Sequence, residues 1–352
     1  MNDTTGKHPD PHALAQRYRD FAVHQAADSS PTLRRWAEAV ADDPVLLALL
    51  ASLPPGKQQP NLVFAAARWH GARPGDVDSL RGVLTTRWAE FEATVRARAT
   101  QTNEPARCGA LLLGLQQLPG PIALFEIGAS AGLCLIPDRY AYTFNGEAAL
   151  TPVNGPGSVS MDIRLGRGLV PPAVMPDIVW RAGLDLRPLD PADADTLAWL
   201  QTLVWPEHEI RRARLTAAAT LAAEEGVQIT AGDLTTDLAR VASGAPRDAT
   251  LVVTHSATLA YLDEPARHRA VEQITRLGAH RISFEARGVD PSVPPIDAPL
   301  TPETLFVAAL DGVSYALADG HGTVLTRPFS TDAGPVQCFG TVSRGPGWAR
   351  EQ

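Results

Sequence analysis

About a third of the way along this chain, an apolar run breaks into a glycine-spaced loop. Residues 122–127 read Ile-Ala-Leu-Phe-Glu-Ile, and the loop reads Gly128-Ala-Ser130-Ala-Gly132. The run predicts a buried β-strand. Glycines in the turn tolerate positive φ and have no Cβ, so backbone N–H groups and the dipole of a following helix can face a ligand. An open α/β sheet places its cofactor here, at the carboxyl end of its first strand.

Three kinds of site use such a loop. Read as Glu-x-Gly-x-Ser-x-Gly, it is similar to the first motif of Rossmann-type S-adenosylmethionine (SAM) methyltransferases, which implies that Glu126 holds the amino-acid end of SAM. Gly128, Ser130 and Gly132 would then approach the nucleoside. As a loose G-x-G-x-x-G it would hold a dinucleotide, although the third glycine is misplaced. It is also a literal G-x-S-x-G, the nucleophile elbow of α/β-hydrolases.

Composition narrows the class of protein. A chain of 352 residues with 45% hydrophobic content can bury one large core or two modest ones, and we expect two. The net charge of −8, without basic runs, argues against nucleic acid as a partner.

No apolar stretch approaches the ~20 residues of a membrane span, and residues 1–16 lack the apolar region of a signal peptide. We expect a cytoplasmic protein without membrane contact; its oligomeric state is not encoded.

The cysteines indicate neither a disulfide framework nor a zinc site. The chain has three cysteines, an odd number, and they are widely spaced with no C-x-x-C pair: Cys108, Cys134 and Cys338. We interpret them as small buried hydrophobic residues. No other metal-ligand spacing is visible, so the expected chemistry is metal-independent.

The pattern along the chain predicts two domains. Residues 1–118 show helical periodicity and form a helical domain or lid, whereas residues 119–352 alternate strand and helix signals. The predicted fold is therefore α/β: a doubly wound, mostly parallel Rossmann-like sheet of the class I methyltransferase type. It ends in an antiparallel hairpin around Asp311-Gly312. A Gly- and Pro-rich excursion at about 137–176 is interpreted as an insertion that borders the pocket. Strands are predicted at 122–127, 178–184, 227–230, 250–254, 281–285, 305–310 and 313–318.

Acidic residues follow the second and third predicted strands. Asp185 is placed to accept hydrogen bonds from the ribose hydroxyls of a cofactor, and its distance from the loop is explained by the insertion. Asp185 would alternatively cap a turn or helix. Asp233, in a Gly-Asp pair, resembles the methyltransferase position that meets the adenine amino group, and Gly-Asp is also a common turn.

The fourth and fifth strands end in further titratable residues. His255 follows the fourth strand, where methyltransferases face the transferring methyl group, and is our candidate for orienting or deprotonating the acceptor. It would otherwise be a hydrogen-bonded neighbour. Glu285 adds a carboxylate at the same rim, or pairs with a nearby arginine. Tyr261, a few residues after His255, is an expected substrate contact.

Other expected substrate contacts lie outside the sheet. Gln101, Asn103 and Glu104 form a dense polar set at the domain junction, where ligands often bind, although this set also fits a capped helix start. Trp205 precedes a charged stretch that closes over a substrate or simply forms a solvated helix face. Tyr140 completes the expected set.

These motifs together resemble a bacterial family catalogued as domain of unknown function 2332, common in actinobacteria. The resemblance covers about Tyr18 to Pro328, with Cys134 standing where asparagine is expected. It implies an architecture more firmly than a reaction. Its motifs here are Gln101–Glu104, Phe125–Leu133, Asp138–Tyr140, Arg181–Leu186 with Pro188–Asp190, Trp205–Glu207, and His255-Ser256.

The glycine loop of that family is similar to the loop of SAM methyltransferases, so a SAM-dependent methyltransferase acting on a small-molecule acceptor is the leading hypothesis. One alternative is a non-catalytic or atypical protein of this fold that binds a metabolite. A serine hydrolase would use Ser130 with His255 or His321 as base, but no strand is predicted before Ile122 to support an oxyanion loop. A dinucleotide oxidoreductase is weakened by the terminal hairpin.

Overall fold

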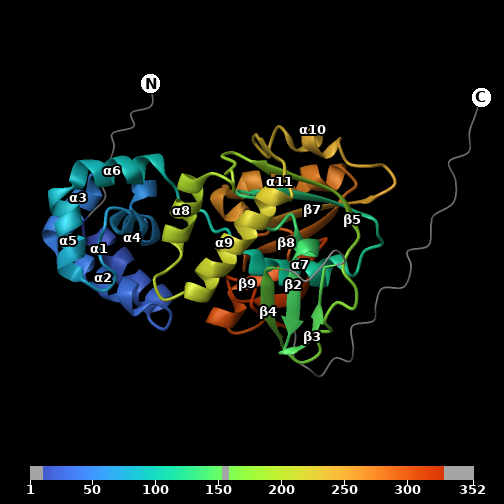
Figure 1. Cartoon of the computed structure of the whole chain (residues 1–352), viewed down its shortest axis with the longest axis horizontal. Helices are drawn as coiled ribbons and strands as arrows, with labels where there is room; N and C mark the ends of the chain where they lie inside the picture. The colour runs from blue at the N-terminus through green and yellow to red at the C-terminus, as the bar shows by residue number, and fades with distance from the viewer. Residues whose placement is uncertain (1–10, 153–157, 329–352) are drawn as a thin grey trace, which may run out of the picture. The chain divides into compact units, whose positions relative to one another are not determined.

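The protein is described here from a computed structural model, covering residues 11–152 and 158–328. The chain divides into two compact units, Met1–Glu104 with Leu189–Gly226, and Pro105–Pro188 with Val227–Gln352 (Figure 1). This division differs from the predicted boundary at 118/119, because residues 189–226 belong with the helices of the first unit. Among the described residues, no helix has both the length and the apolar character needed to cross a membrane.

The regular elements among the described residues of the first unit are all helices. Four of its helices, including those that begin after Ser30 and Asp43, start at side-chain caps that satisfy otherwise free N–H groups of the first turn. Ser30 Oγ accepts from Leu33 N at 3.1 Å, and Asp43 Oδ1 accepts from Val45 N at 2.9 Å. The α-helices of this unit are α1 (Pro11–Phe21), α2 (Pro31–Asp42), α3 (Pro44–Ala51), α4 (Pro60–Trp69), α5 (Val77–Thr86), α6 (Trp88–Ala97), α8 (Ala194–Leu203) and α9 (Glu209–Glu224).

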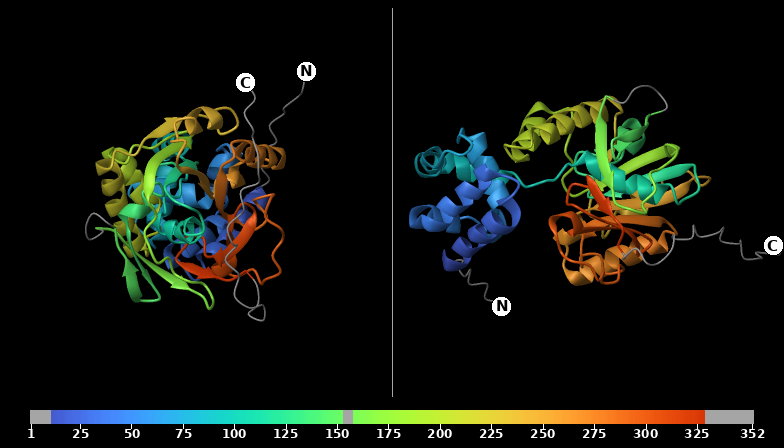
Figure 2. Two further views of the ribbon diagram at one scale, coloured as in Figure 1. Left: turned by 90° about the vertical axis from the view of Figure 1, so that its right-hand side faces the viewer. Right: turned by 90° about the horizontal axis from the view of Figure 1, so that it is seen from below.

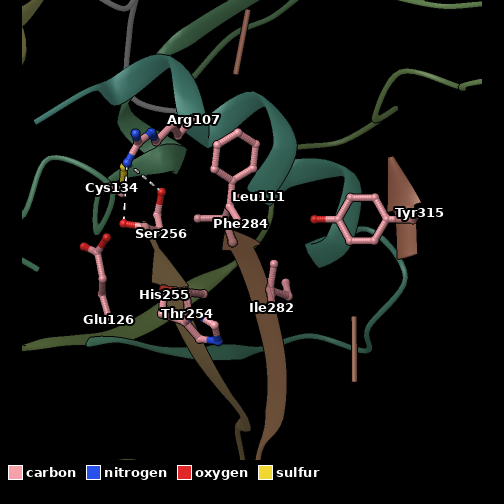
Figure 3. Close-up of a pocket in the computed structure, with 10 residues that line it drawn as sticks. All are labelled: Arg107, Leu111, Glu126, Cys134, Thr254, His255, Ser256, Ile282, Phe284 and Tyr315. Atoms are coloured by element: carbon pink, nitrogen blue, oxygen red, sulfur yellow. Dashed lines mark hydrogen bonds between the residues drawn. The ribbon is translucent and has the colours of Figure 1, made fainter. Parts of the chain in front are cut away.

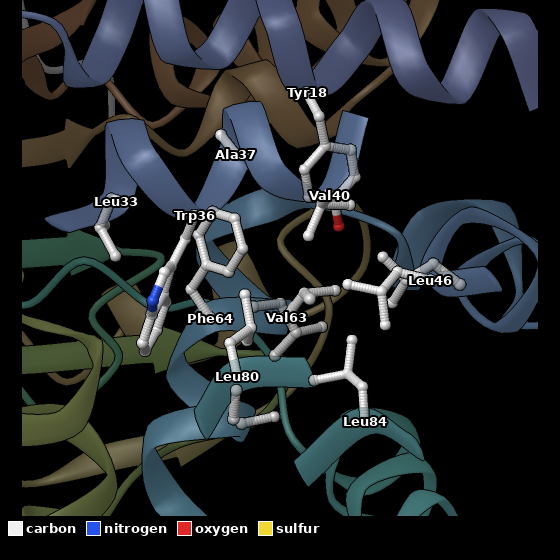
Figure 4. Packing of buried hydrophobic residues seen from close by; sticks show 14 of the residues in the cluster. Tyr18, Leu33, Trp36, Ala37, Val40, Leu46, Val63, Phe64, Leu80 and Leu84 are labelled. Carbon is white, nitrogen blue, oxygen red and sulfur yellow. The ribbon is translucent and has the colours of Figure 1, made fainter. Parts of the chain in front are cut away.

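An aromatic cluster lies in the core of this unit (Figure 4). The ring of Phe64 lies 5.8, 6.0 and 5.6 Å from the rings of Tyr18, Phe21 and Trp36, in edge-on or tilted geometry. Such pairs add about 0.5–1.5 kcal/mol each beyond the burial of their surface. The core is therefore specified by the helical spacing of its apolar residues, as predicted.

Within the described residues, the second unit forms a sheet of 11 strands in the order β3-β2-β4-β11-β10-β9-β8-β7-β1-β5-β6. Most neighbouring pairs are parallel. The strands are β1 (Ile122–Ile127), β2 (Ala141–Phe144), β3 (Glu147–Leu150), β4 (Ser160–Leu165), β5 (Ile178–Asp185), β6 (Ile229–Ala231), β7 (Thr250–Ser256), β8 (His280–Ala286), β9 (Phe306–Leu310), β10 (Val313–Ala318) and β11 (Val324–Thr326).

Strands β6, β5, β1, β7 and β8 are adjacent and parallel, and they coincide with the five predicted α/β strands to within a few residues. The chain moves from β1 to β5 on one side and returns to β7 on the other, so β1 and β7 flank the point where the strand order reverses. Figure 2 shows the sheet in two further views, in which the colour of these strands runs from teal for β1 to orange for β8.

The predicted antiparallel hairpin is confirmed as β9 and β10. Asp311 and Gly312 turn with φ of 49° and 85°, as a two-residue hairpin turn requires. Strand β9 pairs directly with β8, also in antiparallel orientation. The fold is thus mixed α/β, with a large mostly parallel sheet in an unusual strand order.

The Gly- and Pro-rich excursion is not a single irregular loop. Its described residues form β2, β3 and β4, and β4 pairs with β11 at the end of the sheet away from β1. Residues Ser160–Leu165 of β4 do alternate between exposed polar and buried apolar side chains, but the surrounding Gly- and Pro-rich composition led to the interpretation as an insertion. Residues 153–157 lie outside the described residues.

Helices pack on both faces of the parallel strands. Helix α7 (Cys108–Leu115) contacts β8 and β9, and Tyr315 Oη donates to Ala110 O at 2.8 Å. Helices α10 (Leu238–Ala242) and α11 (Glu264–Arg276) contact β5 and β8, respectively, and their apolar side chains join Phe125, Ile127 and Val253 in one core cluster. Because side chains alternate along a strand, Glu126 points to the face opposite that cluster.

Candidate functional site

The glycine loop after β1 has left-handed backbone at alternate positions. The φ angles of Gly128, Ser130 and Gly132 are 71°, 52° and 72°. Its N–H groups are used within the protein. Those of Gly128 and Ala129 donate to Leu184 O at 2.8 and 3.3 Å, and that of Gly132 donates to Ala129 O at 2.7 Å.

Asp185, at the end of β5, holds the middle of this loop. Its Oδ2 accepts from Ser130 N at 2.8 Å, and its Oδ1 accepts from Arg187 N at 2.7 Å. An ionised carboxylate has about four acceptor positions, so both oxygens retain capacity for a further donor. The structure therefore gives Asp185 the turn-stabilising role considered above and leaves it able to accept from a diol.

The α-helix expected after the loop does not form. The described residues after Gly132 continue through turns to the short 3-10 helix Pro137–Arg139 and then to β2. The expectation of a helix dipole aimed at a ligand is therefore wrong, because Pro137 and the start of β2 leave no room for a longer helix.

Protein side chains fill the space beside two of the glycines. A Cβ on Gly128 would lie 2.3 Å from Thr258 Oγ1, and a Cβ on Gly132 would lie 2.8 Å from a methyl group of Val227. Thr258 Oγ1 donates to Ile127 O at 3.2 Å. These glycines thus allow the loop to pack closely on its neighbours.

A small cavity opens on the α7 side of the sheet, near the carboxyl ends of β1, β7 and β8 (Figure 3). Its volume is about 20 Å³, enough for about one water-sized group. One end is polar and the other apolar. Its lining residues are Arg107, Leu111, Glu126, Cys134, Thr254, His255, Ser256, Ile282, Phe284 and Tyr315.

Two buried polar atoms at this cavity, Glu126 Oε2 and Thr254 Oγ1, have no hydrogen-bond partner among the residues that the structure describes. The residues are paired across β1 and β7, so their side chains lie on the same face of the sheet. Burial, followed by the charges of Cys134 and Asp185, raises the pKa of the Glu126 carboxyl well above its usual value, and Arg107 opposes this shift. A buried carboxylate oxygen without a partner is costly, so this corner favours a bound hydrogen-bond donor or cation.

Arg107 stands at the same end of the cavity and is held by several acceptors. Its guanidinium donates to Ser256 Oγ at 3.0 Å and to Gly320 O at 3.0 and 3.2 Å, and it lies 5.6 Å from the ring centres of Phe284 and Phe306. These contacts fix a positive charge near Glu126. A carboxylate and a guanidinium at one site are complementary to a zwitterion.

His255 and Glu285 are brought together, but on the other face of the sheet. Ile127 pairs with His255 in the β1–β7 register, whereas Glu126 pairs with Thr254, so successive side chains alternate between faces. His255 Nδ1 lies 2.8 Å from Glu285 Oε1, and Arg281 Nη1 lies 3.0 Å from His255 Nε2. In Figure 3 the imidazole is directed away from the Glu126 carboxylate.

The partners of His255 define its tautomer. Arginine only donates, so Nε2 must accept, and the proton is on Nδ1, where Glu285 accepts it. The imidazole is thus neutral with both nitrogens engaged, and it has no position free to take a proton from a substrate. This geometry favours the alternative interpretation of His255, in which it is a hydrogen-bonded neighbour of the site and does not deprotonate the acceptor.

Arg281 continues this buried network to Asp290. Its Nη1 donates to Asp290 Oδ2 at 2.6 Å, and Ser292 Oγ donates to Asp290 Oδ1 at 2.7 Å. Burial disfavours the ionised carboxylate, but the positive charge of Arg281 and these hydrogen bonds outweigh the effect of burial and lower the pKa of Asp290 to about 2. The network carries fixed charges of both signs inside the core.

Asp233 is used by its own turn. Its Oδ1 accepts from Thr235 N and Thr235 Oγ1, both at 2.7 Å, and these hydrogen bonds lower the pKa of Asp233. The turn interpretation of this Gly-Asp pair is therefore realised in the structure.

The expected substrate contacts are dispersed. Tyr140 is fully buried and donates to Leu133 O at 2.7 Å, so it is a core residue, and its contact with a substrate stays a prediction. Tyr261 is 75% exposed after β7.

The remaining expected contacts belong to the helical unit. Gln101 and Asn103 lie in an irregular segment there. Buried Glu104 accepts from Arg211 Nε at 2.6 Å and from Arg214 Nη2 at 2.9 Å. Trp205 donates to Asn61 Oδ1 at 3.0 Å. Trp205 and Glu104 thus have structural partners within that unit.

Sequence reasoning missed Arg107, Thr254 and Arg281 as members of these clusters. The sequence does contain a signal that could have identified two of these residues. Arg107 directly precedes the wholly apolar helix α7, and Arg281 interrupts a strand at a position where alternation places a buried residue. Thr254 gives no such signal, since threonine is common in strands.

Comparison with known proteins identifies the family. No curated protein matches the chain. One family model matches residues 15–327, which is most of the chain, and confirms the resemblance drawn from the motifs. The chain belongs to the bacterial family described as "Uncharacterized protein conserved in bacteria (DUF2332)".

Proposed function

We propose that this protein is a SAM-dependent methyltransferase that acts on a small molecule, with the amino-acid end of SAM bound at Glu126. The observation that carries the proposal is the buried, unpartnered Oε2 of Glu126 beside the point where the strand order reverses. Ligands of open α/β sheets bind outside the carboxyl ends of the strands at such a point. An α-ammonium group would supply the missing partner, and Arg107 lies at the same end of the cavity to attract a carboxylate.

The loop geometry favours SAM over a dinucleotide. A pyrophosphate needs free backbone N–H groups and a helix N-terminus. Here the N–H groups of Gly128, Ala129, Ser130 and Gly132 already donate within the protein, and no α-helix follows the loop. SAM carries no phosphate, so it does not require these donors.

The geometry also disfavours the hydrolase. Ser130 has the positive φ of a nucleophile elbow, but an elbow also needs a following helix and a histidine base. His255 is held by Glu285 and Arg281 on one face of the sheet, with both nitrogens engaged. Ser130 therefore has no base in His255.

In the proposed reaction, the residues of this chain bind and orient the reactants. The sulfonium of SAM supplies an activated methyl group, so strong acid–base catalysis is not needed and alignment contributes most of the acceleration. Glu126 would bind the ammonium group, Arg107 would attract the carboxylate, and Asp185 would accept from the ribose while it holds the Ser130 N–H. The His255–Glu285 pair would keep the turn after β7 in place.

The test is calorimetric titration of the full chain with SAM and with S-adenosylhomocysteine, and with NAD for comparison. We expect micromolar binding of the first two. Glu126→Gln keeps the side-chain size but removes the charge, and it should weaken binding by at least about tenfold, as loss of a charge-assisted hydrogen bond does. Asp185→Asn should also weaken binding.

The matched control is Glu272→Gln, which removes an exposed carboxylate of α11 that pairs with Arg276. It should leave binding unchanged. Failure of the folded protein to bind either SAM or S-adenosylhomocysteine would overturn the proposal. Binding of NAD alone would replace it with the dinucleotide alternative. Binding of SAM without turnover on any acceptor would favour the metabolite-binding alternative.

A further inference from the structure

Two cysteines that are far apart in sequence meet beside the cavity. Cys108 is the first residue of α7, and Cys134 follows the glycine loop. Cys108 Sγ lies 4.0 Å from the carbonyl oxygen of Leu133, the residue before Cys134, and the side chains of Cys108 and Cys134 interact. Neither cysteine is in a disulfide. The two sulfur atoms are therefore neighbours across the junction of α7 and the loop.

The two thiols differ in accessibility. Cys108 is fully buried, whereas Cys134 is partly exposed and lines the cavity. Burial, followed by the interaction with Cys134, raises the pKa of the Cys108 thiol well above its usual value. Because Cys134 is the more accessible of the two, a reagent that enters from solvent would meet Cys134 before Cys108.

We propose that Cys108 and Cys134 form a reversible oxidation site that a hydroperoxide converts to a disulfide. The Cys134 thiolate attacks the nearer peroxide oxygen, the O–O bond breaks, and hydroxide or alkoxide leaves and is protonated. The resulting sulfenic acid is attacked by Cys108 sulfur. The S–S bond forms as the S–O bond breaks, and the Cys108 proton leaves with the hydroxide as water. The two thiols lose two electrons together, and the peroxide gains them.

The bond would tie the start of α7 to the segment that follows β1, the strand that carries Glu126. It would also remove the Cys134 thiol from the polar end of the cavity. This inference does not rest on the proposed methyltransferase activity, because it concerns only the geometry and accessibility of the two thiols.

The experiment treats the full-length protein with equimolar hydrogen peroxide, blocks free thiols with N-ethylmaleimide under denaturing conditions, and maps the digest by mass spectrometry without reduction. We expect a Cys108–Cys134 peptide that is two hydrogens lighter than the sum of its parts and that disappears after dithiothreitol. Cys108→Ser should stop the reaction at a Cys134 sulfenic acid, which dimedone traps. Cys134→Ser should leave Cys108 reduced.

The third cysteine provides the matched control, since Cys338→Ser should still give the Cys108–Cys134 disulfide. Full alkylation of both Cys108 and Cys134 after peroxide would overturn the proposal. Pairing of either one only with Cys338 would also overturn it. Folding of each variant is checked by circular dichroism, and a variant that does not fold is replaced by the corresponding alanine substitution.

Discussion

The Nδ1 atom of His255 lies 2.8 Å from Oε1 of Glu285, and both side chains are completely buried. The same oxygen of Glu285 accepts from Thr258 N at 2.9 Å and from Leu259 N at 3.0 Å. One carboxylate oxygen therefore joins β7, β8 and the turn after β7. Within the described part of the chain Glu285 Oε2 has no hydrogen-bond partner, so the hydrogen bonding of this buried carboxylate there depends on Oε1.

Replacement of this carboxylate should destabilise the protein strongly. Glu285→Ala removes the acceptor from His255 and from two backbone N–H groups, and it leaves the Arg281 charge less compensated. Breaking a buried charged network in this way costs about 3–5 kcal/mol of the free energy of unfolding. Urea denaturation at neutral pH measures the change.

Glu303→Ala serves as control for Glu285→Ala. Glu303 pairs with Arg164, but both side chains are more than half exposed, at 54% and 64%. An exposed pair contributes little, so the free energy of unfolding should change by less than about 1 kcal/mol. Equal effects of the two substitutions would contradict a central role for Glu285.

The central strands were predictable because they are short apolar runs bounded by turn residues. Strand β1 has the predicted limits, and the Asp311-Gly312 turn was located from its two residues. The β2–β4 segment was not recognised, because its pairing with β11 joins parts of the chain far apart in sequence. Residues 189–226 were not predicted to join the helical unit for the same reason, because they pack with residues that are far away in sequence.

The candidate site was predictable only in part. The sequence located Glu126, Asp185 and His255 at strand ends, as the structure has them. The sequence analysis did not predict on which face of the sheet each side chain lies. A shift of one residue in strand register moves a side chain to the opposite face. His255 pairs with Ile127 and not with Glu126, so the expected cofactor and catalytic groups lie on opposite sides of the sheet.

The raised pKa of Glu126 predicts a pH-dependent loss of stability. A carboxyl whose pKa is higher in the folded state contributes stability that is fully present below its unfolded pKa, near 4.5, and is lost as pH rises through the folded pKa. Glu126→Gln removes this ionisation. The variant should therefore become progressively more stable relative to the parent as pH rises above about 4.5, as measured by urea denaturation at several pH values.

Glu272→Gln controls for the general effect of losing one negative charge. Its exposed carboxylate should give a small difference without this upward trend. A Glu126→Gln variant whose relative stability stays constant or declines between pH 5 and 8 would contradict the burial of an unpartnered carboxylate.

Asp290 should show the opposite pH dependence. Its pKa falls from 3.8 to about 2 in the folded state, so it contributes stability above the unfolded value that is lost as pH falls through about 2. The shift corresponds to about 2 kcal/mol at neutral pH. Asp290→Asn should lower the free energy of unfolding by about that amount at pH 7, and the difference should shrink as pH falls from about 4 to 2. Exposed Asp248→Asn should show no such convergence.

Gly128 and Gly146 separate the effect of backbone strain from that of close packing. Their φ angles are nearly equal, 71° and 73°, but a Cβ at Gly128 would lie 2.3 Å from Thr258 Oγ1, whereas a Cβ at Gly146 would meet nothing within 4 Å. Alanine at Gly146 should cost about 1–2 kcal/mol, the price of left-handed backbone. Alanine at Gly128 should cost at least about 1 kcal/mol more, because the overlap forces Thr258 to move.

A double-mutant cycle assigns that excess to Thr258. In the Thr258→Ala background, the cost of Gly128→Ala should fall most of the way to that of Gly146→Ala in the parent, because the obstructing hydroxyl and methyl groups are gone and only the Cβ of residue 258, at 3.0 Å, remains close. Thr258→Ala alone removes the hydrogen bond to Ile127 O and should cost about 1 kcal/mol. Equal costs for the two glycine substitutions in the parent would show that the loop adjusts freely. The glycine would then be required only for its φ angle, and the contact between the loop after β1 and the turn after β7 would not constrain the candidate site.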